Sequence, residues 1–216
     1  MLFRSAWQPG DTLSVGIGQG YITVTPLQLV QQAARLASGK AVSPRLVHSV
    51  GGKVLPRPEP VKLDFNDEAL ARVRNGMNRT MNEGGGTAYN WRITQPGFEM
   101  AGKTGTAQVR AYTNEEHARG IIKNSALDWK LRDHALFIGY APVINPKYAI
   151  VSIIEHGAVP AHPHVSMARD VMLFCQQRDP ARMPDAYPLP NSASLTPARQ
   201  RADAKPTPQK LAKAGD

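Results

Sequence analysis

Cysteine is almost missing from this sequence: Cys175 is the only one among 216 residues. A single cysteine excludes an internal disulfide framework and any zinc cluster built from several cysteines. Cys175 follows four apolar residues, 171–174, which favours a small core side chain over a reactive nucleophile. No apolar run approaches the roughly 20 residues that a membrane-spanning helix needs, and no signal-peptide pattern opens the chain.

Acidic residues are outnumbered by basic ones, 17 to 26, which leaves a formal net charge of +9. This charge suits an anionic neighbourhood, and nucleic acid, lipid head groups or an anionic polymer such as cell-wall glycan would all fit. Nucleic-acid motifs are missing, however: the sequence has no zinc-finger spacing, no RNP-like box and no basic heptad helix. We therefore expect no nucleic-acid partner, and the charge does not choose between the other two.

Hydrophobic periodicity predicts a mixed fold of helices and strands. Helices are expected at 25–39 and 66–82, with Thr25 and Asn66 as N-caps, and a third amphipathic helix at 165–177. In that last helix, Val165, Ala168, Met172 and Cys175 should point inward. Extended segments are expected at 98–109, 134–141 and 148–155, and a small hairpin at 46–55.

Other segments have weaker patterns. We expect a turn at Gln8-Pro9-Gly10-Asp11 and then a glycine-rich stretch, 12–20, whose glycines relieve crowding against packed neighbours. Residues 110–133 form an insertion that is either a solvated loop or a flap over a substrate groove; it contains Glu115, Glu116, His117 and Lys123. From residue 178 onward, Pro, Ala and Gln dominate without periodicity, which predicts a disordered tail.

The most unusual stretch is Gly102-Lys103-Thr104-Gly105-Thr106, inside the predicted strand 98–109. Alternation would place Gly102, Thr104 and Thr106 on one face and Lys103 and Gly105 on the other. Two interior glycines indicate a place where another backbone comes close. An edge strand with bare backbone, two hydroxyls and an ammonium suits an extended peptide that ends in a carboxylate, although a solvated surface strand would have the same residue types.

Several blocks resemble class B penicillin-binding proteins, most closely the elongation-specific type, penicillin-binding protein 2. The resemblance covers about residues 3–177 and rests on blocks in the family order: Pro9-Gly10-Asp11-Thr12, Gly16-Ile17-Gly18-Gln19-Gly20, Thr25-Pro26-Leu27-Gln28-Leu29, Gly86-Thr87-Ala88-Tyr89, Ala101-Gly102-Lys103-Thr104-Gly105-Thr106-Ala107-Gln108-Val109 and Arg132–Pro142. It implies an α+β fold, an antiparallel sheet of about five strands flanked by helices, of which residues 1–177 would supply the third, fourth and fifth strands. It also implies a peptidoglycan D,D-transpeptidase that cross-links stem peptides through a serine acyl-enzyme and binds penicillin.

The same resemblance implies roles for the lysine strand. Lys103 would supply positive potential and join a proton relay, and Thr104 and Thr106 would bind the substrate carboxylate. Gly105 would leave room for the substrate backbone. The backbone N–H of Thr106 would be one of two oxyanion donors, so Lys103 and Thr106 are the expected catalytic residues. No cofactor is implied.

Two of the family's three motifs are absent from this sequence. No serine begins Ser-x-x-Lys, which contains the family's nucleophile, and Ser-x-Asn or Ser-x-Asp does not occur. Tyr112-Thr113-Asn114 imitates a variant of the second motif but follows the lysine strand, where the family places it before. We therefore expect a C-terminal fragment of the transpeptidase domain that is inactive by itself, with the membrane anchor also outside it.

Alternatives remain open at this point. The chain could belong to a serine β-lactamase of the same fold, or to a non-catalytic module that binds peptidoglycan or partner proteins. His156, His162 and His164 could bind zinc, but without an ordered framework we favour loop histidines and expect no metal. For the full-length protein, the resemblance implies a place on the periplasmic face of the inner membrane, with stem peptides, β-lactams, a membrane glycosyltransferase and other elongation-complex proteins as partners.

Overall fold

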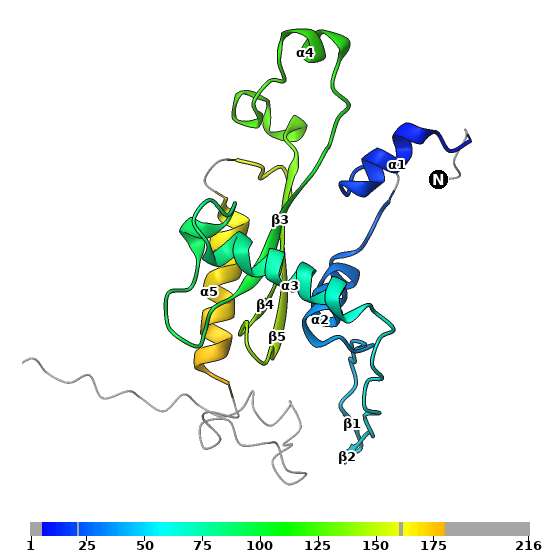
Figure 1. Cartoon of the computed structure of the whole chain (residues 1–216), viewed down its shortest axis with the longest axis vertical. Helices are drawn as coiled ribbons and strands as arrows, with labels where there is room; N and C mark the ends of the chain where they lie inside the picture. Colours follow the sequence, from blue (N-terminus) through cyan, green and yellow to red (C-terminus); the bar gives the residue numbers. More distant parts are fainter. Residues whose placement is uncertain (1–5, 21, 160–161, 180–216) are drawn as a thin grey trace, which may run out of the picture.

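A three-stranded antiparallel sheet forms the centre of the computed structural model, which describes residues 6–20, 22–159 and 162–179. Its strands are β3 (Ala101–Ala107), β4 (His134–Ala141) and β5 (Tyr148–Ile154), in the order β3-β4-β5. Helix α5 (Pro163–Gln177) packs on one face, α2 (Pro26–Ser38) packs on the other, and α3 (Asp67–Asn82) lies against β3 (Figure 1). The expected α+β class, with helices around an antiparallel sheet, is confirmed.

The three expected helices form where their caps predict. In α2, Thr25 accepts from the backbone N–H of Gln28, whose side chain accepts in return from the N–H of Thr25, and Gly39 ends the helix with a φ of 69°. Asn66 caps α3 by accepting from the N–H of Ala69. Helix α5 begins at Pro163, two residues earlier than expected, and its residue Cys175 is only half-buried.

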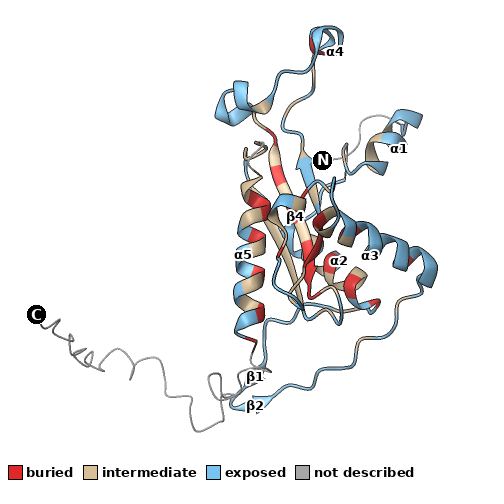
Figure 2. Cartoon of the chain, turned by 60° about the vertical axis from the view of Figure 1, so that its left-hand side comes forward, coloured by how far each residue is buried: buried red, intermediate tan, exposed pale blue. Residues whose placement is uncertain are grey.

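The core has one part on each face of the sheet. On the α5 face, the apolar side chains come from α3, the segment after it, the sheet and α5: Met81, Ala88, Ile93, Met100, Phe137, Ala141, Val165, Ala168 and Met172. On the α2 face a smaller cluster contains Ala37, Met77, Ala101 and Tyr140. Figure 2 shows the buried residues of α5 along the side that meets the sheet. The two clusters account for the period-2 burial along β4.

The segment before α2 differs from expectation. Instead of a turn and a crowded glycine stretch, residues Pro9–Gly16 form helix α1, because Pro9 suits a first helical turn and the side chain of Asp11 accepts from the backbone N–H of Gln8 at 2.8 Å. No residue of α1 is buried, and a Cβ built on Gly16 or Gly18 would meet no atom within 4 Å. The prediction that the glycines relieve crowding is therefore wrong for Gly16 and Gly18, while a Cβ at Gly20 would lie 3.4 Å from the Cβ of Ser14.

The insertion at 110–133 is more ordered than a solvated loop. It contains α4 (Asn114–Arg119) and two short 3₁₀ turns, η2 (Asn124–Ala126) and η3 (Trp129–Leu131). Glu116 is buried and accepts two hydrogen bonds from Arg110, which holds the pKa of its carboxyl at about 2, well below the usual range. Of the two alternatives for this insertion, the burial of Glu116 argues against a fully solvated loop, and the flap over the substrate groove stays a prediction. Figure 1 shows α4 beyond the end of the sheet.

Smaller features complete the fold. Strands β1 (Ser49–Val50) and β2 (Lys53–Val54) pair as the expected hairpin, and η1 (Tyr89–Trp91) follows α3. The predicted tail, 178–216, lies outside the described residues except for its first two, and Asp179 is buried and ion-paired with Lys147 at 2.8 Å. Within the described ranges, no helix is long and apolar enough to cross a membrane.

Gly102 is the position where β3 tolerates least change. It pairs with Gly139, and an added Cβ would overlap the ring of Phe137 and come within 2.7 Å of the carbonyl oxygen of Ile138. We predict that Gly102→Ala destabilises the protein by about 1–3 kcal/mol, the usual cost of overpacking. Urea unfolding followed by circular dichroism measures this.

Gly105 is the matched control, because a Cβ there would meet only the Cβ of Leu136, at 3.7 Å. Gly105→Ala should change the unfolding free energy by less than about 1 kcal/mol. Equal losses for the two variants would contradict the close contact at Gly102.

Candidate active site

The outer edge of β3 changes character along its length. No strand pairs with β3 on the side away from β4 among the described residues. Just before the strand, Asn82 of α3 donates to the carbonyl oxygen of Met100 at 3.0 Å. Beyond that point, from Lys103 to Thr106, the strand lines an open groove of about 580 Å³. The edge is thus covered at its beginning and accessible where the lysine motif lies.

The side chains of this motif alternate as predicted. Thr104 pairs with Phe137 and Thr106 with Ala135, so both threonines lie on the α5 face of the sheet. Lys103 and Gly105 therefore lie on the α2 face. The exposure of the residues along β3 is also as expected for an open edge. Lys103, Gly105 and Thr106 are exposed, while Ala101 and Gly102 are buried. The strand itself is shorter than the predicted 98–109.

The polar atoms of the motif are partly engaged. The ammonium of Lys103 donates to the carbonyl oxygen of Thr104 at 2.8 Å and lies 3.4 Å from its hydroxyl. That hydroxyl is also 3.1 Å from the hydroxyl of Thr87. The hydroxyl of Thr106 has no hydrogen-bond partner in the described part of the chain. Thr106 therefore offers a free hydroxyl, and Thr87 orients the hydroxyl of Thr104.

Gln19 forms the other wall of the groove. Its side-chain amide donates to the carbonyl oxygen of Thr106 at 2.6 Å, and its Oε1 lies 3.5 Å from the backbone nitrogen of Gln108. Sequence reasoning missed Gln19 and Thr87 as site residues and used them only as parts of family blocks. A polar residue flanked by glycines was the available signal for Gln19, since Gly18 and Gly20 both adopt positive φ angles.

The histidines separate into two groups. The ring Nδ1–H of His156 donates to the carbonyl oxygen of Arg132 at 2.9 Å, and its backbone N–H donates to Nδ1 of His134 at 2.9 Å. His162 and His164 line the groove instead, with their ring centroids 5.5 Å apart. No group of three or more metal-ligating side chains lies together in the described ranges. The structure therefore does not bring His156, His162 and His164 together as a zinc site would require.

His164 is deeply buried beside the groove, with 2% of its surface exposed. Neither ring nitrogen has a hydrogen-bond partner among the described residues. Burial, together with a smaller effect of the neighbouring His162, lowers the pKa of its imidazole to about 4. At neutral pH the ring is therefore uncharged, and the positive charge of the groove comes from Lys103 and Lys123.

The lining of the groove determines which ligands suit it. Two lysines and several hydroxyl and amide groups line it, and no carboxylate does so among the described residues. This combination favours anionic oxygens over cations. One serine, Ser125, also lines the groove, but no described side chain hydrogen-bonds to its hydroxyl as a general base would. The described residues thus form a binding surface without an activated nucleophile.

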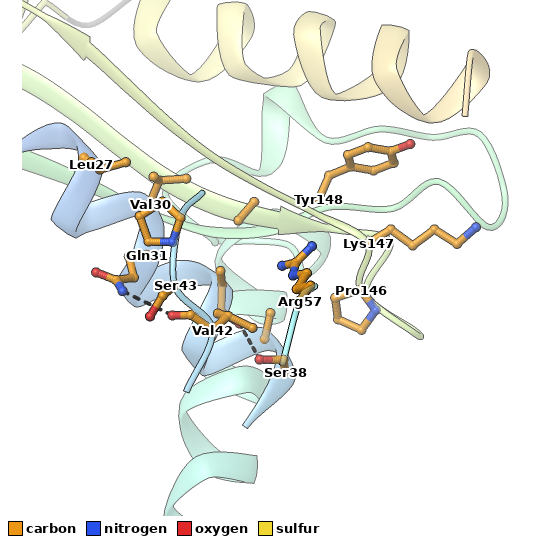
Figure 3. A pocket seen from close by; sticks show the side chains of 14 residues that line it. Leu27, Val30, Gln31, Ser38, Val42, Ser43, Arg57, Pro146, Lys147 and Tyr148 are labelled. Carbon is orange, nitrogen blue, oxygen red and sulfur yellow. Dashed lines mark hydrogen bonds between the residues drawn. The ribbon is translucent and has the colours of Figure 1, made fainter. Parts of the chain in front are cut away.

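A second cavity, of about 310 Å³, lies between α2 and the start of β5 (Figure 3). Leu27 and Val30 line it with small apolar residues, and Gln31 donates across it to the carbonyl oxygen of Val42. It contains no cluster of titratable side chains, and it adjoins β5, whose outer edge is unpaired in the described part of the chain. The chemistry of the β3 groove is therefore the better candidate for an active site.

The chain matches a known family profile and a curated relative. The family profile described as penicillin binding protein transpeptidase domain matches residues 3–173. The peptidoglycan D,D-transpeptidase MrdA of Haemophilus influenzae is 35% identical over 185 residues, which cover 82% of this chain and 28% of that protein. The chain thus spans less than a third of the length of this curated relative.

Two solved structures are similar in fold. Penicillin-binding protein 2 of Pseudomonas aeruginosa, in complex with WCK 5153, matches with a TM-score of 0.60 and 32% identity over 81% of this chain and 35% of that one. Penicillin-binding protein 2 of Helicobacter pylori, in complex with MreC, matches with a TM-score of 0.63 and 28% identity over 81% of this chain and 29% of that one.

The buried imidazole of His164 predicts an acid-dependent loss of stability. Its folded pKa of about 4 lies below the unfolded value near 6.5, so the unfolded chain binds the proton first. The contribution of His164 is complete above about pH 6.5 and is lost as the pH falls towards 4. We expect His164→Leu to reduce the loss of unfolding free energy across this interval by an amount on the order of 2 kcal/mol.

Urea unfolding between pH 4 and 7.5 measures this difference. His48→Leu is the control, since His48 is exposed on the segment before β1 and should leave the pH profile unchanged. A profile for His164→Leu that is parallel to the wild type would show that this imidazole does not titrate at a depressed pKa.

Proposed function

This chain belongs to the penicillin-binding protein transpeptidase family, and from that premise we propose that it supplies the substrate-binding strand of a peptidoglycan D,D-transpeptidase. The single observation that supports the proposal is the exposed Lys103–Thr106 segment at an open sheet edge, lining a groove with two lysines and no described carboxylate. A stem peptide that ends in D-alanyl-D-alanine has the extended backbone and terminal carboxylate that suit this groove.

Each residue of the strand has a proposed part in the reaction. The Thr106 hydroxyl binds the terminal carboxylate by a charge-assisted hydrogen bond. Lys103 stabilises the bound carboxylate by its positive charge, and Thr104 does so by a hydrogen bond. Gly105, where an added Cβ would make only an ordinary contact with the Cβ of Leu136 at 3.7 Å, leaves room for the substrate backbone. The backbone N–H of Thr106 stabilises the oxyanion that forms when a serine attacks the penultimate carbonyl.

The serine itself is expected in a Ser-x-x-Lys motif, which this sequence does not contain. The acyl-enzyme would then react with an amine of a neighbouring stem peptide, releasing the enzyme and forming the cross-link. A β-lactam, which resembles the D-alanyl-D-alanine end, would acylate the same serine. We propose a single functional unit formed by residues 1–177 together with that nucleophile-containing part.

Location and partners follow from the same proposal. The relative from Helicobacter pylori was solved in complex with MreC, which supports protein partners for this type of enzyme. We propose that the full-length protein acts at the periplasmic face of the inner membrane, where peptidoglycan is made, with a glycosyltransferase and other elongation proteins. A non-catalytic binding module is the second candidate, favoured by the unactivated Ser125 in the groove.

A chimera tests the proposal, with this chain replacing the matching C-terminal segment of the Haemophilus influenzae transpeptidase. We expect fluorescent penicillin to label the chimera covalently and Lys103→Ala to reduce the labelling rate at least about 100-fold, since the relay and the positive potential are both lost. Lys53→Ala, an exposed lysine in the β1–β2 hairpin, should label normally. A folded chimera that is not labelled would favour the non-catalytic module.

Thr106→Val separates the hydroxyl of Thr106 from its backbone. The variant keeps the N–H oxyanion donor but loses the hydrogen bond to the ligand carboxylate, worth about 1.5–3 kcal/mol for a charged partner. We expect acylation of the chimera to slow about 10- to 100-fold. Stopped-flow acylation kinetics measure this, with Thr23→Val, an exposed threonine outside the groove, as the control. Unchanged kinetics would show that the Thr106 hydroxyl does not contact the carboxylate.

A further inference from the structure

A second surface of the molecule is a projection that shares no lining residue with the β3 groove. Residues 40–62, here called the hairpin arm, leave the body after α2, turn through the β1–β2 hairpin and return before α3. The two legs of the arm join at its base, where the N–H of Ala41 donates to the carbonyl oxygen of Val61 at 2.8 Å. The arm projects beyond α2 and α3 in both views of the whole chain (Figures 1 and 2).

The apolar side chains of the hairpin arm have no core to pack into. Among residues 43–59, Ser49 is half-buried and all the others are exposed. Six apolar side chains of the arm are 37% exposed or more: Leu46, Val47, Val50, Val54, Leu55 and Val61. An isolated two-stranded hairpin is marginally stable in water unless something packs against it. The arm is therefore suited to a covering surface that the described residues do not supply.

The charges of the hairpin arm indicate the chemistry of that surface. Five basic residues and one acidic residue, Glu59, give residues 40–62 a net charge of +4, against +9 for the whole chain. Lys62 is ion-paired with Asp67 at 3.0 Å. The other four basic residues have no carboxylate partner in the described part of the chain: Lys40, Arg45, Lys53 and Arg57. An anionic surface is thus the complementary one.

Apolar and basic side chains share one face of the hairpin. Val50 pairs with Lys53 across the turn, and the N–H of Leu55 donates to the carbonyl oxygen of His48 at 3.0 Å, so the pairing continues past the strands. Alternation then places these four residues on the same face. Amphipathic segments of this composition lie in the interface of anionic bilayers, where apolar groups enter the head-group region and basic side chains reach the phosphates. A soluble anionic polymer would leave the apolar groups in water.

We propose that the hairpin arm binds the surface of an anionic lipid bilayer. This interaction goes beyond the proposed function and does not depend on the groove. The side chains of Leu46 and Val50 enter the head-group region, while the backbone stays at its level, where water and head groups satisfy its hydrogen bonds. Lys53 and Arg57 bind lipid phosphates. The basic charge of the arm is thereby assigned to lipid head groups, which the net charge of the chain did not separate from an anionic polymer.

Vesicle cosedimentation of the full 216-residue chain tests the charged contacts. We expect binding to vesicles of phosphatidylglycerol and phosphatidylethanolamine but not to phosphatidylcholine alone, and weaker binding at high salt. Lys53→Gln combined with Arg57→Gln should weaken binding about 25-fold, because each basic residue near an anionic surface contributes about fivefold. The control is Arg119→Gln combined with Lys130→Gln, two exposed residues of the 110–133 insertion. It removes the same charge and should bind as the wild type does.

A fluorescent label tests the apolar contact. Since Cys175 is the only cysteine, Cys175→Ser combined with Leu46→Cys leaves one position for an environment-sensitive fluorophore. We expect vesicle binding to shift its emission to the blue and brominated lipids to quench it. The same label at Ile144→Cys should show neither effect, since Ile144 lies in the β4–β5 turn, although it is 80% exposed and Leu46 99%. Leu46→Ser should weaken binding about 10-fold, and Ile144→Ser should not.

Three results would overturn the proposal. One is the absence of binding to the anionic vesicles. Another is an equal loss of binding in the two double-charge variants, which would assign binding to the net charge of the chain. The third is binding that requires Lys53 and Arg57 but is insensitive to Leu46→Ser, without a spectral shift at position 46, which would favour an anionic polymer. Circular dichroism verifies that the variants fold alike. Penicillin labelling of the chimera in solution tests the proposed function separately.

Discussion

The close packing of the Phe137 ring against Gly102 is the contact on which the position of β3 depends. It requires a glycine on one strand and a fully buried aromatic ring on the next, and it lies between the helix layers. The register that follows from it continues without interruption to Thr106 and Ala135. The exposed half of β3 is therefore the extension of a buried half, held in the same register with β4.

This continuous register matters because the candidate site consists largely of backbone. Side chains from three separate segments, Asn82, Lys103 and Gln19, occupy outward carbonyls of residues 100–106, while the N–H groups of Thr104 and Thr106 remain accessible. Natural proteins protect open sheet edges against unwanted strand pairing. Here Lys103 and Gln19 cover part of the open edge in this way, beside the N–H groups of Thr104 and Thr106.

The electrostatics of the groove agree with this arrangement. Lys103 and Lys123 contribute positive charge, and His164 stays neutral because burial opposes its protonation. A chain with a net charge of +9 could bind many anions over its surface. In the groove these charges lie beside backbone donors and the Thr106 hydroxyl, an arrangement that suits an oriented oxygen-rich ligand better than a diffuse attraction.

The sequence by itself determined the local elements and the most important strand. The capping pair Thr25–Gln28, the helix stripes and the small residues around Lys103 depend on neighbours a few positions apart, and local periodicity therefore predicted three helices, three strands and the faces of the lysine motif. Only the tertiary structure placed Gln19 against Thr106, 87 residues away, buried Glu116 beside Arg110, and separated His156 from His162 and His164. These outcomes depend on which surfaces meet when the layers pack. The hydrophobic period of one segment cannot predict such a contact, because the free energy of the contact depends on the side chains of both packed surfaces.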